Sequence, residues 1–261
     1  MQRLRLRYAK RGRLRFSSHR DFQRALERAL RRAGVPMAYS AGFNPHPRIS
    51  YANAAPTGAA SEAEYVEIAV TRRCDPEALR AALDDALPPG LDVLEVVEAA
   101  AGPLADRLEA SRWRIELPGL SPAVVEEAVR SFLGAERVEV QRVMKTGPRT
   151  FDARGAVRDL QVGASAGAGD EIDPADRADL GGNVTDRVAQ GGQGSCAILH
   201  LVVRHTTPAV RPDDVLAGLR SQAHLAPLSP PRMTRLAQGP LDEETGRVAD
   251  PLAPDRNAVG A

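Results

Sequence analysis

Residues 20–33 predict a helix that is apolar along one side and densely basic along the other. At about 100° per residue, the apolar positions form one face: Phe22, Ala25, Leu26, Ala29, Leu30 and Ala33. Arginines crowd the opposite face, where Glu27 is the one acid among them: Arg20, Arg24, Arg28, Arg31 and Arg32. A helix divided in this way packs one side into a core and presents the other to a partner. The fold must therefore bury one side of this helix, and its arginines are expected to meet something negatively charged.

The positive charge of the chain is concentrated around this helix. Residues 1–50 carry 13 Lys and Arg against 2 Asp and Glu, whereas the other 211 residues carry 22 against 32. Phosphate or an acidic protein surface is the natural partner of such a region, and nucleic acid is the commonest source of phosphate. Arginine also suits planar, bidentate contacts with phosphate. The alternative is a solvated basic face balanced by the acidic remainder of the chain.

The first half of the chain predicts the order strand, helix, strand, strand, helix, strand. Period-two alternation and β-branched runs indicate strands, and apolar residues three and four apart indicate helices. The expected strands are 3–8 continuing at 14–16, then 35–39 and 48–52 on either side of a proline-rich loop, then 65–70 and 91–97; the second helix begins at Asp75-Pro76.

The second half repeats that order. Its expected strands are 113–117, a hairpin of 138–143 with 156–162, then 197–204 and 233–236, and its helices begin at Pro122 and Pro212. Proline costs nothing in the first helical turn. Two successive βαββαβ units predict an α+β fold of two tandem ferredoxin-like units, each with helices on one side of an antiparallel sheet.

The expected domains are residues 1–105, which carry the basic helix and the loop, and residues 106–237. Residues 163–195 hold eight glycines and six acids against two basic residues, so they predict a disordered acidic insertion in the second unit. Residues 238–261 are acidic and aperiodic, and they predict a flexible tail. No run of 18 apolar residues occurs, and the start lacks the apolar segment of a secretory signal. We therefore expect a cytoplasmic protein without a membrane partner.

The loop from Gly42 to Arg48 is the first candidate site. Pro45 and Pro47 fix their own φ angles and keep the residues before them out of helical conformations. A loop of this rigidity loses little entropy when it binds a partner, and it presents four side chains: Phe43, Asn44, His46 and Arg48. The alternative is a tight, well-packed turn with no role in binding.

A second candidate lies at the start of the basic helix, where His19 follows Ser17 and Ser18, one of which is expected to cap the helix. The free N–H groups of a helix start bind anions, and a histidine there can hydrogen-bond a phosphate. His19 and His46 are the candidate catalytic residues, as an acid–base pair for metal-independent RNA cleavage. This requires that both flank one cleft lined by Ser18, Asn44 and Arg48. The alternative for His19 is a solvent-exposed residue in the capping region.

The turn at residues 145–152 contributes Lys145 and Arg149 as further candidate contacts for RNA or a protein partner, or it is only the end of a hairpin. His200 and His205 are interpreted as structural. The chain lacks a phosphate-binding GxxxxGK[ST] loop, a GxGxxG strand–helix turn, HExxH and GxSxG. Its two cysteines, Cys74 and Cys196, are far apart and form no CxxC pair. We therefore expect neither a metal nor a cofactor.

The first 70 residues strongly resemble a radical-SAM-associated family of unknown function, in which the domain is fused behind a radical SAM protein or encoded beside one. The resemblance is dense there and thinner over the rest of residues 1–160 and 195–237. The matching motif positions are Gly12, Leu14, Arg15, Phe16, Ser18, His19 and Asp21, then Gly42 through Pro47, then Ser61, Glu62, Glu64 and Tyr65.

The resemblance implies a radical SAM enzyme as partner and, in actinobacteria, a neighbourhood of ribosome and RNA-processing genes, and it supplies no activity. An RNA or ribosome-related substrate is the expectation that fits this context. Combined with the basic helix, the resemblance predicts a non-catalytic accessory subunit that recognises RNA or a ribonucleoprotein for that enzyme. Two alternatives stay open: a protein-interaction module that docks on the radical SAM enzyme, and a ribonuclease or RNA-modifying enzyme that uses His19 and His46.

Overall fold

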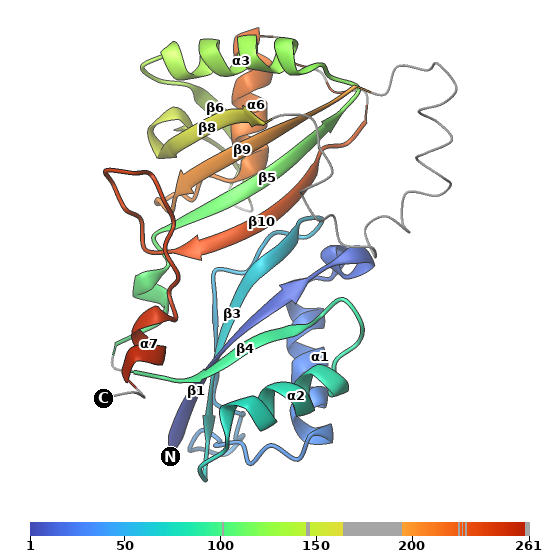
Figure 1. Ribbon diagram of the computed structural model, residues 1–261, viewed down its shortest axis with the longest axis vertical. Coiled ribbons are helices and arrows are strands. Elements are labelled where there is room, and N and C mark those ends of the chain that lie inside the picture. Colours follow the sequence, from blue (N-terminus) through green and yellow to red (C-terminus); the bar gives the residue numbers. More distant parts are fainter. Residues whose placement is uncertain are drawn as a thin grey trace. The chain divides into compact units, whose positions relative to one another are not determined.

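The chain has a mixed α/β structure, seen here in a computed structural model that describes residues 1–100, 102–144, 147–163, 195–223, 225, 227 and 229–258. It divides into two compact units, which we call unit 1 (Met1–Leu108 with Asp250–Ala261) and unit 2 (Glu109–Ala249). The described residues form five α-helices, and the strand pairings within each unit are antiparallel, as the α+β prediction requires at the level of class (Figure 1).

The sheet of unit 1 has the strand order β4-β1-β3-β2. Ile68 of β3 lies opposite Leu4 of β1 and also opposite Ile49 of β2, so β1 and β2 flank β3. Because both are antiparallel to β3, β1 and β2 run in the same direction. The elements are β1 (Gln2–Lys10), η1 (Gly12–Phe16), α1 (His19–Arg32), β2 (Ile49–Ala52), β3 (Ala60–Val70), α2 (Pro76–Ala86), β4 (Val93–Glu98), η2 (Ala105–Arg107) and α7 (Ala253–Ala258).

The core of unit 1 lies between α1, α2 and one face of this sheet (Figure 1). Alternation along β1 and β3 sends every second side chain into it, and the apolar face predicted for α1 is the buried one. Its members include Leu4, Leu6, Tyr8, Phe22, Leu26, Ala29, Leu30, Val66, Ile68, Leu79 and Leu83. The first strand ends before the 14–16 extension that was expected. Gly12 has a φ of 51°, and the chain after it winds into the 3₁₀ turn η1.

The opposite face of the unit 1 sheet is covered by residues 250–258. The side chain of Leu252 is fully buried in a small apolar cluster that includes Tyr65 and Leu104. Asp255, in the same segment, is also fully buried. This differs from the flexible tail expected for residues 238–261, because the segment carries one apolar and one carboxylate side chain that both find partners in unit 1. The acidic composition of the segment indicated that it would be exposed to solvent. Composition alone cannot show that one of its carboxylates pairs with arginines far away in the sequence.

Four charged side chains, which we call the Asp255 cluster, join this segment to the sheet: Asp255, Arg5, Arg107 and Glu67. Asp255 accepts from Arg5 Nη1 at 2.7 Å and from Arg107 Nη1 at 2.9 Å, and Arg5 Nε donates to Glu67 Oε2 at 2.8 Å. Neither Arg5 nor Asp255 has any exposed side-chain surface. Burial lowers the pKa of Arg5, but its bonds to the two carboxylates outweigh that effect and its pKa lies above the ordinary value.

The sheet of unit 2 has the order β10-β5-β9-β8, and α3 and α6 pack against it (Figure 1). Close packing explains Gly218 in α6, where a Cβ would lie 2.8 Å from the ring of Phe132 in α3. The elements are β5 (Ala110–Pro118), α3 (Pro122–Gly134), β6 (Glu139–Met144), β7 (Gly147–Asp152), η3 (Arg154–Ala156), β8 (Val157–Gly163), β9 (Cys196–Arg204), α6 (Pro212–Ala223) and β10 (Arg232–Gly239).

The hairpin expected between residues 138–143 and 156–162 is wrong. β6 pairs instead with β7 in a two-stranded sheet, and β8 pairs with β9. Gly147, with a φ of 109°, permits a reversal immediately after β6, so the segment interpreted as a turn contains a strand. The acidic insertion predicted at residues 163–195 lies outside the described residues except for its two end positions. Among the helices of the described part of the chain, none combines the length and apolarity needed to cross a membrane.

Candidate nucleic-acid interface

The N-terminus of α1 is set by a capping box. The Ser18 side chain accepts from the Asp21 N–H at 3.2 Å, and the Asp21 carboxylate accepts from the Ser18 N–H at 3.1 Å. The hydroxyl hydrogen bond from Ser18 is the main reason why the pKa of Asp21 lies below its ordinary value. Ser18, a predicted binding residue, therefore has a structural partner already.

Four arginines of α1 form an exposed row, which we call the arginine stripe: Arg20, Arg24, Arg28 and Arg31. They fall within about 80° of arc on the helix and span about 16 Å along its axis. None of the four has an ion pair or hydrogen bond to another residue that the structure describes. Arg32 differs, because its Nη1 donates to the Ala86 carbonyl oxygen at 3.1 Å. The stripe therefore offers four exposed cations in one line, two of which, Arg20 and Arg24, feel the nearby carboxylate of Asp21.

An aromatic cluster lies beneath the start of the stripe. The rings of Tyr8 and Phe22 stack with centroids 4.2 Å apart, and Phe22 meets Tyr51 edge-on at 6.1 Å. His19 extends this series, with its ring 4.9 Å from that of Tyr51 and its Nε2 3.1 Å from Gln23 Nε2. Sequence reasoning missed Tyr51, since the residue lies alone on a short strand and only the fold brings it to the helix start.

Tyr51 is expected to make the stability of unit 1 fall at alkaline pH. Its hydroxyl is buried without a hydrogen-bond partner among the described residues, and this burial, aided by Glu27, raises its pKa from 10.0 to about 12. The folded state thus favours the neutral phenol, and stability present below pH 10 is expected to fall as the pH rises from 10 to about 12. Tyr51→Phe should abolish this fall and be at least as stable at neutral pH.

The measurement is the free energy of unfolding against pH for the wild type and Tyr51→Phe. The control is Tyr39→Phe, because Tyr39 is 53% exposed and its hydroxyl stays hydrated. An identical alkaline profile in wild type and Tyr51→Phe would contradict the assignment.

The proline loop is a closed structure. Ser40 N–H donates to the His46 carbonyl oxygen at 2.8 Å, and His46 N–H donates to Ser40 Oγ at 3.0 Å. Beyond this closure all the predicted side chains are exposed, and Phe43 is exposed completely. Arg48 contacts Met1 through Nη1 and Sδ at 3.9 Å. The loop therefore presents its side chains to solvent, and their role in binding stays a prediction.

The structure places His19 and His46 at opposite ends of α1. β1 and β2 run in the same direction, so the connection leaving β1 and the loop entering β2 lie at opposite ends of the sheet. The ring of His19 packs on Tyr51, and Tyr51 lies five residue steps along a largely extended chain, about 16 Å, from His46. The expectation of one shared cleft was wrong because it took the two connections as neighbours at one edge. The separate roles of His19 and His46 stay predictions.

In unit 2, Arg149 lies exposed on β7 opposite Arg142, and Lys145 lies outside the described residues. Arg142 is engaged with the ring of Phe151, 4.8 Å from its centroid, and with the carbonyl oxygen of Ala209. Arg149 is thus the one predicted contact of unit 2 that the structure places.

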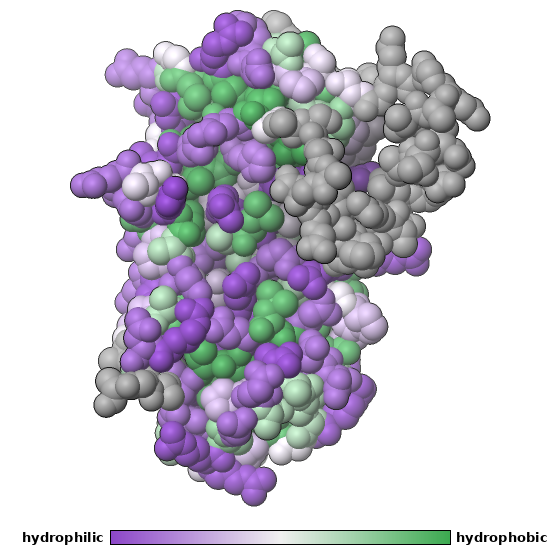
Figure 2. All heavy atoms as spheres, in the orientation of Figure 1, coloured by the Kyte–Doolittle hydropathy of each residue, from purple (hydrophilic) through white to green (hydrophobic). Residues whose placement is uncertain are grey.

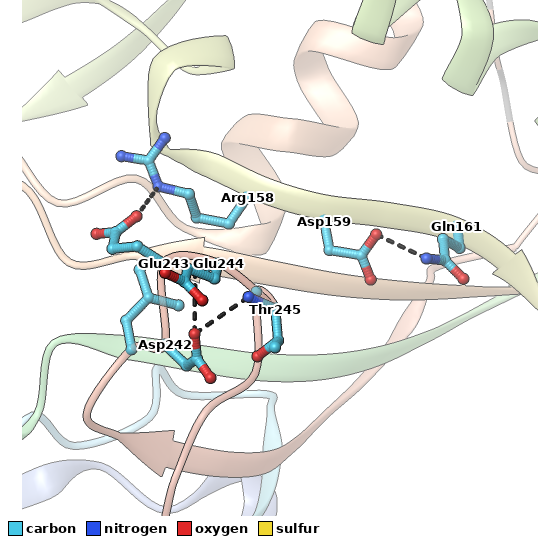
Figure 3. A pocket seen from close by; sticks show the side chains of 9 residues that line it. Arg158, Asp159, Gln161, Asp242, Glu243, Glu244 and Thr245 are labelled. Atoms are coloured by element: carbon cyan, nitrogen blue, oxygen red, sulfur yellow. Dashed lines mark hydrogen bonds and ion pairs between the residues drawn. The ribbon is translucent and has the colours of Figure 1, made fainter.

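A solvent-open hollow of about 240 Å³ lies beside β8 in unit 2, and acids dominate it (Figure 3). Asp159 accepts from Gln161 Nε2 at 2.8 Å, Asp242 accepts from the Thr245 N–H at 3.1 Å, and Glu243 lies 3.6 Å from Arg158 Nε. Its remaining acid, Glu244, adds to a negative lining that repels phosphate. No group of three or more His, Cys, Asp or Glu side chains suited to a metal ion occurs in the part of the chain that the structure describes.

Sequence reasoning also missed a serine–histidine contact in unit 2. Ser111 Oγ lies 2.6 Å from His205 Nε2, but Ser111 is only 1% exposed, so a substrate has no access to its hydroxyl. The contact agrees with a structural role for His205.

On the face drawn in Figure 2, hydrophilic side chains predominate, with hydrophobic areas between them. Because the hollow in unit 2 is acidic and Ser111 is inaccessible, the arginine stripe with the proline loop is the strongest candidate site.

Comparison with solved structures finds a crystal structure of an unknown protein from Galdieria sulphuraria. It is 10% identical, with 90% of this chain and 98% of that chain covered, and the TM-score is 0.24. A score this low does not establish a shared fold. No curated protein matches the chain. A family match does cover the stripe and the loop: residues 3–212 match the family described as "Uncharacterized protein conserved in bacteria (DUF2344)". Since this match spans most of the sequence, the chain belongs to the DUF2344 family of uncharacterized bacterial proteins.

Proposed function

We propose that this protein is an RNA-binding accessory subunit of a radical SAM enzyme, and that it contacts RNA phosphates with the arginine stripe of α1. The observation that carries the proposal is that Arg20, Arg24, Arg28 and Arg31 are exposed and aligned, and none forms an ion pair or hydrogen bond with another described residue. Exposed cations in a row suit a polyanion better than a single small anion. The radical SAM partner comes from the resemblance of the first 70 residues.

The fold proposed for this subunit is a tandem of ferredoxin-like units. The orders β4-β1-β3-β2 and β10-β5-β9-β8, each antiparallel, support it. In such units the sheet face opposite the helices is a common place for single-stranded RNA. In unit 1 that face holds Leu252 and Asp255 of the C-terminal segment, so the helix side is the surface left for RNA.

The test is the salt dependence of binding to labelled single-stranded RNA, followed by fluorescence anisotropy. For a single strand, the logarithm of the binding constant falls by about 0.7 per neutralised phosphate for each tenfold rise in salt. Replacing all four stripe arginines with glutamine is therefore expected to weaken binding and to reduce the salt slope by about 3.

The matched control replaces four exposed arginines elsewhere with glutamine: Arg72, Arg130, Arg137 and Arg220. This variant has the same net charge and should keep the wild-type slope. A wild type that shows no salt-dependent RNA binding, or a stripe variant with an unchanged slope, overturns the proposal. If the stripe variant keeps RNA binding but no longer co-purifies with the radical SAM protein, the stripe is a protein-docking surface instead.

A further inference from the structure

We propose that Phe43 seats an unpaired RNA base at the C-terminal end of the arginine stripe, so that the protein selects single-stranded over paired RNA. The inference rests on the proposed function and names the kind of RNA that the site takes. It concerns the proline loop, residues 40–48, which the phosphate contacts alone do not use.

The loop holds Phe43 outward with little freedom to collapse. Its base is closed twice between Ser40 and His46, at 2.8 and 3.0 Å, and Tyr39 pairs across it with Pro47. The closed loop therefore fixes the backbone around a large aromatic ring that is 100% exposed. An exposed ring has no packing role, whereas a ring held ready for stacking loses little entropy when a base binds.

The fold brings this ring to the end of the stripe. α1 runs opposite to β2, so the loop that enters β2 lies at the C-terminal end of α1, beyond Arg31. The carbonyl groups at a helix C-terminus disfavour phosphate, whereas an uncharged base is tolerated there. The two halves of the surface are thus complementary, with cations along the helix for the backbone and an aromatic ring at its end for a base.

The loop that carries the ring also carries polar side chains. Asn44, His46 and Arg48 are exposed on the same loop, and Tyr39 is a second, half-exposed ring. An unpaired base offers both its face and its hydrogen-bonding edge, so a stacking ring among donors and acceptors fits it. In a duplex each base is stacked and paired already, and Phe43 then has nothing to bind.

The experiment compares Phe43→Ala with the wild type on a single-stranded RNA and on the fully paired duplex of the same sequence. Loss of one stacked base is expected to weaken single-strand binding about 5- to 150-fold and to leave duplex binding unchanged. Phe43→Trp, which keeps an aromatic ring for stacking, should bind single-stranded RNA with about the affinity of the wild type. The salt slope should stay at the wild-type value, because the phosphate contacts are intact.

The matched control is Phe16→Ala, which removes another exposed ring of unit 1, 58% exposed, near the opposite end of α1. It should bind both RNAs like the wild type. Equal loss on single strand and duplex, or no loss on either, overturns the stacking inference while a normal salt slope leaves the proposed function standing. Absence of salt-dependent binding in the wild type is the separate failure of the proposed function. If RNA binding is unaffected but the radical SAM protein is lost from Phe43→Ala, the ring docks a protein.

Discussion

Asp255→Ala is expected to destabilise unit 1 by about 3–5 kcal/mol, because it leaves the fully buried guanidinium of Arg5 without its closest carboxylate. Arg107, which is 16% exposed, loses the same partner. The measurement is urea unfolding followed by tyrosine fluorescence. All four tyrosines lie in unit 1 and the single tryptophan lies in unit 2, so the two signals report the two units separately.

The matched control for the Asp255 cluster is Arg256→Gln. Arg256 pairs with Glu95 at 2.5 Å, but it is 40% exposed, and surface pairs contribute about 0–1 kcal/mol. A loss of less than about 1 kcal/mol in Asp255→Ala would show that Arg5 finds another partner or water, contrary to the buried cluster. The double variant Arg5→Met with Asp255→Leu should recover part of the loss, because no buried charge is then left alone.

Phe22→Ala is expected to cost unit 1 about 3–5 kcal/mol. The Phe22 ring, 4% exposed, stacks on Tyr8 and meets Tyr51 edge-on, so its removal leaves a cavity beneath the start of α1. Tyrosine-detected unfolding measures this loss, and tryptophan-detected unfolding of unit 2 should stay unchanged. Phe22→Leu, which fills most of the volume, should cost less than half as much. Equal costs of the two substitutions would contradict the cavity argument, because they would mean that the loss comes from the ring contacts and that refilling the volume recovers nothing.

The predicted helices and most predicted strands follow from local pattern. The apolar face of α1 is the buried one because residues three and four apart lie on the same side of a helix. Burying Phe22 and Leu26 therefore buries that whole face. The exposed arginine stripe follows from the same period. Pairing between β6 and β7 was missed because a single glycine, Gly147, decides where the chain reverses.

Long-range relations could not be read from the sequence. Arg5 alternates with Leu4 and Leu6, which indicates an exposed position, and nothing nearby shows that Asp255, 250 residues away, covers it. The separation of His19 from His46 likewise depends on strand direction. Local sequence placed each histidine correctly in a loop or helix start, but only the parallel course of β1 and β2 puts them at opposite ends.

The C-terminal segment of unit 1 has a consequence for the timing of synthesis. Residues 1–108 leave the ribosome well before Asp250–Ala261, and the whole of unit 2 is made between them. At typical rates of elongation this interval is about 7–30 s. During that time the sheet of unit 1 lacks the segment that covers the face opposite its helices. On that face Arg5 and Tyr65 are then exposed to water. Unit 1 therefore begins to fold first but completes its fold only after the whole of unit 2 has been synthesised.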